Sequence, residues 1–330
     1  MTVVLLVASF AILLAGALLF TNAIEWLGHR LGIAQGAVGS LLAAVATALP
    51  ESLIPIVAII SPEEDSVDVA IGAIIGAPFM LATVAMALVG ISAVLYRRRR
   101  AAGTGLSVHF ETLRRDLTFF MVFFAAALAL GLGAPRWLQI AAAVFFVFAY
   151  AVYVTWTLRR GGAVQEHETL RPLVMDLSRS AAPRMTLIVV QLVVALGAIV
   201  GGAHLFVEEL LVVAEKLGAE PLVLALVLAP LATELPEKAN SFFWVREGKD
   251  TLALGNITGA MVFQSTLPVA LGLAFTDWDL TSFSAVAAGL GLAGGALAIW
   301  ALQVRRRFSA PAIVGWAALF ATFVVVIVVA

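Results

Sequence analysis

The sequence of 330 residues has no cysteine, only 12% charged residues and four histidines. Without cysteine, disulfides, thiol redox chemistry and cysteine-ligated metal sites are excluded. The histidines form no metal-binding motif, and no nucleophile motif is present. The net charge of −1 provides no basic surface for nucleic acid. We therefore expect no catalytic residue, no cofactor and no nucleic-acid partner, and we expect that the protein is not an enzyme.

Apolar residues make up 62% of the chain, and its mean hydropathy is +1.05. The long apolar runs lack the period-two alternation of a membrane β-barrel. Because lipid cannot hydrogen-bond to the backbone, such runs must be helical. The sequence thus predicts an all-α integral membrane protein in a lipid bilayer, and at about 20 residues per crossing ten spans can be drawn. They cover residues 3–28, 34–59, 67–95, 117–133, 137–158, 185–212, 220–244, 250–275, 282–303 and 310–329.

The basic residues gather in four of the polar breaks between these spans. The clusters are residues 97–100 with 114–115, residues 159–184, residues 246–249 and residues 305–307. Arginine and lysine mark cytoplasmic loops, and ten spans place all four clusters on one side. We predict that this side is cytoplasmic, that both termini lie outside, and that the membrane is the plasma (inner) membrane. Residues 159–183 are interpreted as a cytoplasmic linker between two halves, residues 1–158 and 184–330.

One motif occurs in both halves. Residues 47–51 and 233–237 both read Thr-x-Leu-Pro-Glu, and the alignment runs without a gap from Gly16 and Gly202 at an offset of 186. A Gly-x-Ile-x-Gly element follows in each copy, so the repeats extend over about residues 16–90 and 202–275. Since each half has five spans, an odd number, the second half must enter the membrane inverted. Two inverted five-helix repeats are typical of secondary transporters, whose substrate site lies near the bilayer midplane.

Pro50 and Pro236, within the repeated motif, predict proline-broken helices at a central site. Proline lacks a backbone N–H and clashes with the preceding turn. The break would free carbonyls about one turn earlier, which is tolerated at membrane depth only around a cavity. The threonine and glutamate of each motif are four residues apart and share a helix face. These side chains are Thr47, Glu51, Thr233 and Glu237.

Glu51 and Glu237 lie about sixteen residues inside their predicted spans, and a carboxylate at that depth is a functional hypothesis by default. Two such helix faces would form an all-oxygen cage containing two or three carboxylates. Oxygen ligands of this kind suit a hard cation, Ca²⁺ above all, with Na⁺, Mg²⁺ or Mn²⁺ less favoured. The sequence therefore predicts a cation site between the two motifs.

Three more polar residues are candidates for this site. Glu234 is either a third carboxylate of the cage or the partner of Lys238, four residues later, in an ion pair within one helix. Gln264 and Asn256 are further candidates, because an amide in hydrocarbon needs a partner. The glycines of Gly-x-Ile-x-Gly, at 72–76 and 255–259, let two helices approach closely.

At these motifs the chain resembles the sodium/calcium exchanger family of the calcium/cation antiporter superfamily. That family has two inverted α-repeats with a Gly-Thr-Ser-x-Pro-Glu and a Gly-Asn-x-x-Gly-Ser-Asn element. The resemblance implies that Glu51 and Glu237 coordinate calcium. It also implies that Thr47 and Thr233 lend oxygens to the ion, largely from the backbone.

The chain departs from the family pattern at residues expected to hold sodium. The serine after the threonine is Ala48 in one repeat and Glu234 in the other. The Asn or Asp that follows the second element is replaced by Leu81 and Gln264. Hydroxyls and amides for several sodium ions are therefore largely missing, while a buried glutamate could take up a proton itself. Sodium and proton coupling both stay open.

These features predict a secondary active cation antiporter that moves Ca²⁺ outward in exchange for Na⁺ or H⁺ by alternating access. Its partners would be inorganic cations, and the sequence does not define its oligomeric state. An antiporter for Mg²⁺, Mn²⁺ or Na⁺ is one alternative, and a degenerate, non-transporting membrane sensor is another. An intramembrane enzyme with Glu51 and Glu237 as an acid–base pair lacks any supporting motif.

Overall fold

The computed structural model describes residues 1–31, 51–63, 65–108, 110–160, 170–178, 180 and 182–329, with the backbone alone for residues 158, 160, 235–237, 239 and 240. The regular structure of these residues is helical, and their β-pairing is confined to an isolated bridge between Gly105 and Arg307. The prediction of an all-α protein is confirmed.

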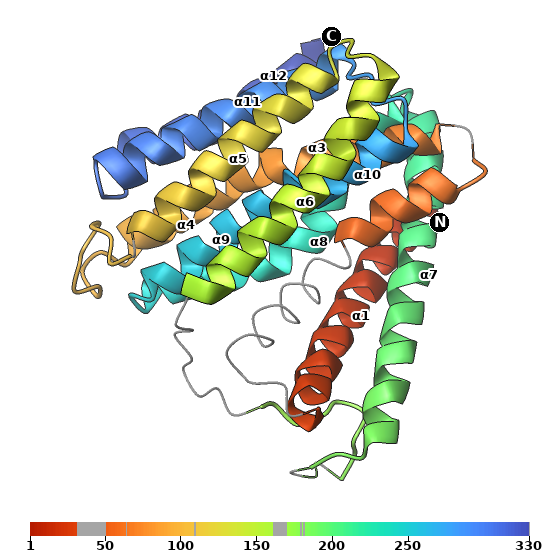
Figure 1. Ribbon diagram of the computed structural model, residues 1–330, viewed down its shortest axis with the longest axis horizontal. Coiled ribbons are helices and arrows are strands. Elements are labelled where there is room, and N and C mark those ends of the chain that lie inside the picture. The colour runs from red at the N-terminus through yellow and green to blue at the C-terminus, as the bar shows by residue number, and fades with distance from the viewer. Residues whose placement is uncertain are drawn as a thin grey trace.

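Each of the ten predicted spans coincides with a helix or a group of consecutive helices (Figure 1), although only residues 51–59 of the second span are described. The helices are α1 (Thr2–Arg30), Glu51–Ile60, α3 (Ser66–Met80), a π-helical stretch (Leu81–Ala85), α4 (Met86–Leu95), α5 (Phe110–Leu130), α6 (Arg136–Arg160), α7 (Met185–Leu217), α8 (Pro221–Arg246), α9 (Asp250–Gln264), α10 (Leu267–Phe275), α11 (Ser282–Ala298), a second π-helical stretch (Ile299–Val304) and α12 (Ala310–Val329). Among the described residues, seven helical segments are long and apolar enough to cross a membrane by themselves.

The turn between α7 and α8 shows how local residues set these boundaries. α7 ends at Leu217, and the next residue, Gly218, adopts the left-handed φ of 62° and donates its N–H to carbonyls of the last helical turn. Glycine is favoured there because it carries no Cβ. α8 begins at Pro221, whose fixed φ suits the first helical turn, where no N–H partner is needed. The chain therefore reverses direction within a few residues.

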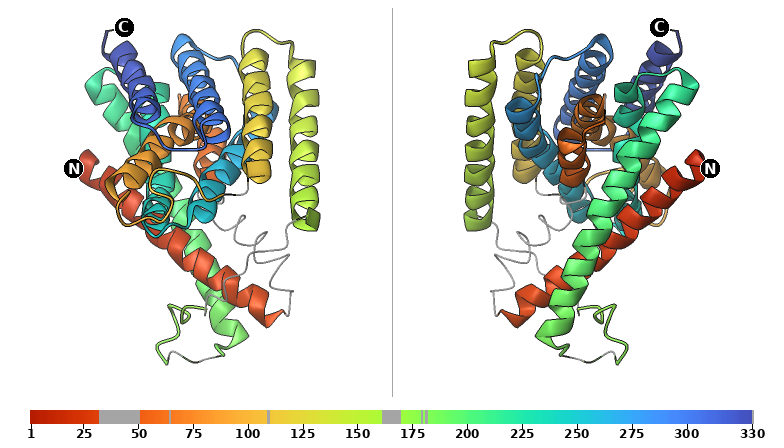
Figure 2. Two further views of the ribbon diagram at one scale, coloured as in Figure 1. Left: turned by 90° about the vertical axis from the view of Figure 1, so that its left-hand side faces the viewer. Right: turned by 90° about the vertical axis from the view of Figure 1, so that its right-hand side faces the viewer.

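α1 and α7 form a crossed pair that lies at an angle to the other helices (Figure 2). A Cβ on Gly16 would lie 2.8 Å from Cγ1 of Ile199, and a Cβ on Gly202 would lie 3.1 Å from Cγ of Leu13. At the offset of 186, Gly16 corresponds to Gly202 and Leu13 corresponds to Ile199. The two contacts are therefore reciprocal, which is the pattern that a two-fold relation between the halves produces.

α3 and α8 pack against each other at the glycines of the repeated element. A Cβ on Gly72 would lie 2.5 Å from the Leu222 carbonyl oxygen and 2.7 Å from Cβ of Ala225. A Cβ on Gly76 would overlap the carbonyl group of Leu226. The backbones can approach this closely only because neither glycine has a side chain. The predicted role of this element in helix packing is confirmed for its first copy.

We expect Gly76→Ala to destabilise the protein by about 1–3 kcal/mol, because α3 and α8 must separate to accept the methyl group. Thermal unfolding in detergent would show a lower midpoint temperature. Gly197→Ala, on the outward face of α7, is the matched control, since its Cβ would meet nothing within 4 Å among the described residues. Equal midpoints for the two variants would contradict the close contact.

Three of the polar breaks that contain the basic clusters lie together at one end of the helices. The Arg100 guanidinium forms a buried ion pair with Asp250, at 2.7 Å from Oδ1 and 2.9 Å from Oδ2. The same side chain donates to the carbonyl oxygen of Val245 at 2.6 Å. The Phe308 N–H donates to the Thr104 carbonyl oxygen at 2.9 Å. The segments after α4, after α8 and after the second π-helical stretch thus lie together, as the predicted common side requires.

Residues 170–178, within the predicted linker, lie against α1 and α7. The N–H of Val174 donates to Asn22 Oδ1 at 3.1 Å, and the N–H of Met175 donates to Gln191 Oε1 at 2.9 Å. Gln191 Nε2 also donates to Asn22 Oδ1 at 3.0 Å. Two amide side chains, one on each helix, therefore bond to the linker segment and to each other.

The helix break predicted at Pro236 requires a correction, because α8 continues through this residue from Pro221 to Arg246. A proline in a membrane helix removes one backbone hydrogen bond, which neighbouring groups can compensate without ending the helix. The interruption in this repeat lies instead at Ser265 and Thr266, between α9 and α10. Pro50 lies outside the described residues.

Candidate cation site

Gln264 lies at the break between α9 and α10. It is the last residue of α9, and Thr266, with φ −124° and ψ −74°, separates the two helices. The Thr266 hydroxyl donates to the Val262 carbonyl oxygen at 2.8 Å, which satisfies one of the groups at the end of α9. Pro268 follows in the first turn of α10. The break therefore holds an amide side chain near the middle of the span Asp250–Phe275.

Two carboxylates converge on this amide. Gln264 Nε2 donates a hydrogen bond to Oε2 of Glu51, and it lies 3.3 Å from Oε1 of Glu234. All three side chains are buried, with 1% of Gln264, 8% of Glu51 and 4% of Glu234 exposed. Glu51 begins the described helix Glu51–Ile60, and Glu234 lies near the middle of α8. Two carboxylates separated by 183 positions in the sequence thus share one donor.

An ammonium group also belongs to this cluster. Lys238 Nζ lies 2.9 Å from Oε2 of Glu234, one helical turn away on α8, and 4% of Lys238 is exposed. The predicted ion pair is therefore present, and Glu234 is at the same time bonded to Gln264. A buried carboxylate needs both a counter-charge and hydrogen bonds to offset its lost hydration. The pair lies inside the candidate site rather than away from it.

The other predicted residues do not join this contact. The Thr233 hydroxyl donates to the Ala229 carbonyl oxygen of its own helix at 3.2 Å. Asn256 lies eight residues before Gln264, about two turns away, and its Nδ2 donates to Ser241 Oγ at 3.2 Å. Glu237 lies on α8, but its side chain is outside the described part of the structure, and so is all of Thr47.

Side chains of His, Cys, Asp and Glu do not gather in groups of three or more within the described part of the chain. The described cluster therefore contains two carboxylates, one amide and one ammonium group. The carboxylate oxygens of this cluster are ligands of the kind that hard cations prefer.

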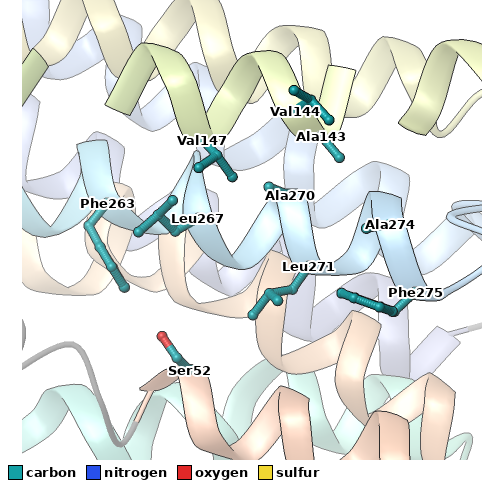
Figure 3. A pocket seen from close by; sticks show the side chains of 10 residues that line it. All are labelled: Ser52, Ala143, Val144, Val147, Phe263, Leu267, Ala270, Leu271, Ala274 and Phe275. Carbon is teal, nitrogen blue, oxygen red and sulfur yellow. The ribbon is translucent and has the colours of Figure 1, made fainter. Parts of the chain in front are cut away.

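An apolar pocket of about 450 Å³ adjoins the cluster (Figure 3). Ser52 follows Glu51 in the chain, and Phe263 and Leu267 flank Gln264. The remaining lining residues belong to α6 and α10 and are Ala143, Val144, Val147, Ala270, Leu271, Ala274 and Phe275. Ser52 contributes the hydroxyl of this lining. The pocket therefore places an apolar surface beside the cluster and offers few groups that could bind a cation.

Asp116 on α5 is another buried carboxylate, which the sequence did not indicate. Its Oδ1 accepts hydrogen bonds from the Tyr153 hydroxyl at 2.7 Å and from Arg115 Nε at 3.0 Å. Its Oδ2 accepts one from the Thr258 hydroxyl at 3.0 Å, on the same helix as Gln264. Arg114 and Arg115 precede it in the sequence, so it resembled a solvated loop residue. Asp116 joins α5 and α6 to the helix that carries Gln264.

Comparison with known proteins identifies one family. The family model described as "Sodium/calcium exchanger protein" matches residues 1–159 and 187–329. The chain is also 34% identical over 93 residues to the sodium/calcium exchanger MaX1 of Methanosarcina acetivorans, which covers 28% of this chain and 27% of that protein. Nearly the whole chain lies within the family match.

Two solved structures share the fold. The H⁺/Ca²⁺ exchanger CAX superposes with a TM-score of 0.72 at 20% identity, over 98% of this chain and 81% of that one. The sodium-calcium exchanger NCX_Mj superposes with a TM-score of 0.58 at 19% identity, over 98% of this chain and 99% of that one. At these identities the likeness concerns the fold, and the helices of this chain have the arrangement of exchanger membrane proteins.

Proposed function

The chain belongs to the sodium/calcium exchanger protein family, and from this premise we propose that it exchanges Ca²⁺ for Na⁺ or H⁺ by alternating access. Membership of the family supports a cation antiporter in general. The observation that carries the more specific proposal is the convergence of Glu51 and Glu234 on Gln264 at a helix break. Discontinuous helices near mid-membrane commonly hold the ions of secondary transporters.

We assign the cation site to residues from both repeats. Glu51 contributes the carboxylate of the first repeat, and Glu237 contributes that of the second. Glu234 and Gln264 hold these groups in position, while Thr47 and Thr233 offer oxygens and Asn256 lines the approach. This assignment is supported by the described contacts of Glu51, Glu234 and Gln264 and by the repeated motif.

Calcium is favoured because its charge and its ligand preference fit carboxylates. The two motifs contain three glutamates, Glu51, Glu234 and Glu237, and Lys238 directly follows the second motif. Together they carry a formal charge of −2, which one Ca²⁺ or two monovalent counter-ions would balance. Mg²⁺ is less suited, because it requires near-octahedral geometry and gives up its water reluctantly.

The test is uptake of ⁴⁵Ca²⁺ into proteoliposomes of the purified protein under an imposed Na⁺ gradient or an imposed pH gradient. We expect one gradient to drive uptake above that of protein-free liposomes, and that gradient identifies the counter-ion. Excess unlabelled Mg²⁺ or Mn²⁺ should compete weakly. If neither gradient drives ⁴⁵Ca²⁺ uptake by folded protein, the proposal of Ca²⁺ exchange is wrong. If the protein then binds Ca²⁺ without transporting it, the result favours a sensor.

We also propose that the basic end faces the cytoplasm, that both termini lie outside, and that residues 1–158 and 184–330 are the two halves joined by a linker. Because the chain has no cysteine, single cysteines can report the orientation. Leu132, in the turn between α5 and α6, is 64% exposed, and Leu177, in the linker, is 97% exposed. We expect a membrane-impermeant maleimide to label Leu132→Cys in intact cells.

The control for this measurement is Leu177→Cys, which should be labelled only after the cells are made permeable. Labelling of both cysteines after permeabilisation shows that each one is accessible in the folded protein. The reverse pattern, with Leu177→Cys labelled in intact cells, would invert the proposed orientation.

A further inference from the structure

The cation cluster contains a positive charge of its own. Lys238 Nζ lies 2.9 Å from Oε2 of Glu234, while Oε1 of the same carboxylate lies 3.3 Å from Gln264 Nε2. Each oxygen of Glu234 thus faces a donor within the protein. The side chains of Lys238 and Glu234 are each 5% exposed, so bulk water does not screen this pair.

We propose that the ammonium group of Lys238 is a tethered cation that permanently fills a position which Na⁺ would otherwise occupy beside Glu234. The lysine would thereby reduce by one the number of monovalent cations that the site binds. This inference deepens the proposed function and rests on it, since it assigns a role within the same site.

The physical argument begins with the cost of an uncompensated charge. Two buried carboxylates that share a single neutral donor repel each other, and a nearby cation is needed to stabilise both. A lysine ammonium is a compact point charge with three donors, so it can replace a monovalent metal ion electrostatically. The spacing of four residues between Glu234 and Lys238 keeps the ammonium within reach of the carboxylate on one helix face.

The sequence provides a second reason. At positions where the family carries hydroxyls or amides expected to hold sodium, this chain has Ala48, Leu81 and Glu234. The serine expected after the threonine of the second motif is replaced by Glu234, whose partner is Lys238. Glu234 and Lys238 carry opposite formal charges, so the pair adds no net charge to the site.

The test is Lys238→Gln, which removes the charge and keeps a polar side chain of similar length. The midpoint temperature of the purified protein would be measured in detergent at pH 8 while NaCl replaces choline chloride at constant ionic strength. By linkage, the dependence of stability on the logarithm of the Na⁺ concentration gives the number of Na⁺ ions that bind on folding. We expect Lys238→Gln to bind about one more Na⁺ than the wild-type protein.

Two further variants separate charge from structure. Lys238→Arg keeps the positive charge and should bind as many Na⁺ ions as the wild type. The double variant Glu234→Gln/Lys238→Gln removes both charges together and should also return the number of bound Na⁺ ions to the wild-type value. If Lys238→Gln does not fold, Lys238→Met is measured together with its partner double variant Glu234→Gln/Lys238→Met.

The outcomes distinguish this inference from the proposed function. If the Na⁺ dependence of the lysine variants equals that of the wild type, Lys238 is only a structural partner of Glu234 and the inference is overturned. If these variants gain a Na⁺ site while wild-type protein shows no ⁴⁵Ca²⁺ flux under either gradient, the tethered cation is supported and the exchange proposal fails. A gain of Na⁺ binding together with wild-type flux supports both.

Discussion

Glu51→Gln is expected to abolish cation exchange and to reduce ⁴⁵Ca²⁺ uptake to the level of protein-free liposomes. The replacement preserves the size of the side chain but removes the negative charge that lies against Gln264 in a buried cluster. In the proposed site this carboxylate would lie against the bound Ca²⁺, and removal of one partner of such a buried charge pair costs about 3–5 kcal/mol. At about 1.4 kcal/mol per factor of ten, Ca²⁺ binding should weaken by at least roughly 100-fold.

Glu208→Gln is the matched control for this experiment. It makes the same chemical change on α7, where the Glu208 side chain is 45% exposed and lies 3.2 Å from His204. A surface pair of this kind contributes little, so uptake should equal that of the wild type. Ca²⁺ uptake by Glu51→Gln at the wild-type rate would remove Glu51 from the proposed site.

Asp250→Asn is expected to cause the largest loss of stability, about 3–5 kcal/mol. Arg100 and Asp250 are paired through two contacts at 2.7 and 2.9 Å, and 1% of each side chain is exposed. The asparagine would leave the guanidinium charge buried without a counter-charge. Asp250 also accepts the Ser107 N–H at 3.0 Å, so the segment after α4 should loosen as well. Thermal unfolding in detergent would show the lower midpoint temperature.

The neighbouring pair between Lys249 and Glu247 provides the control. Its atoms lie 3.4 Å apart, and the side chains are 41% and 54% exposed. Glu247→Gln should therefore change the stability by less than about 1 kcal/mol. If Asp250→Asn were as stable as Glu247→Gln, the buried pair could not be what holds the segments of this end together.

The sequence predicted the spans, and it predicted that a polar cluster would form from the repeated motifs. Hydrophobic runs define membrane helices because lipid leaves no alternative backbone structure. The same physics singled out Glu51, Glu234 and Gln264, since a buried carboxylate or amide is costly without partners. These three side chains do meet in the structure. The coordination of an ion by Glu51 and Glu237 stays a prediction.

The contacts that the sequence did not predict join residues far apart in the chain. Arg100 and Asp250 each lie beside other charged residues in the sequence, and nothing local shows that they are buried together. Asp116 likewise finds Thr258 across 142 positions. A helix break at Pro236 was expected because proline disfavours the interior of a helix. In the structure α8 continues through this residue. These features depend on tertiary packing, which patterns in a single sequence do not reveal.

The crossing of α1 and α7 has a consequence for how the protein is made. Gly16 and Gly202 lie 186 residues apart, so at about 5–20 residues per second α1 leaves the ribosome roughly 10–40 s before the matching part of α7. Before α7 is made, Gly16 lacks its contact with Ile199, and Asn22 lacks the linker segment to which it bonds in the finished protein until that segment has been synthesised. α1 therefore completes its packing only after α7 has been synthesised. A nascent chain that ends before α7 should be recognised as incomplete by the quality-control proteases of the membrane.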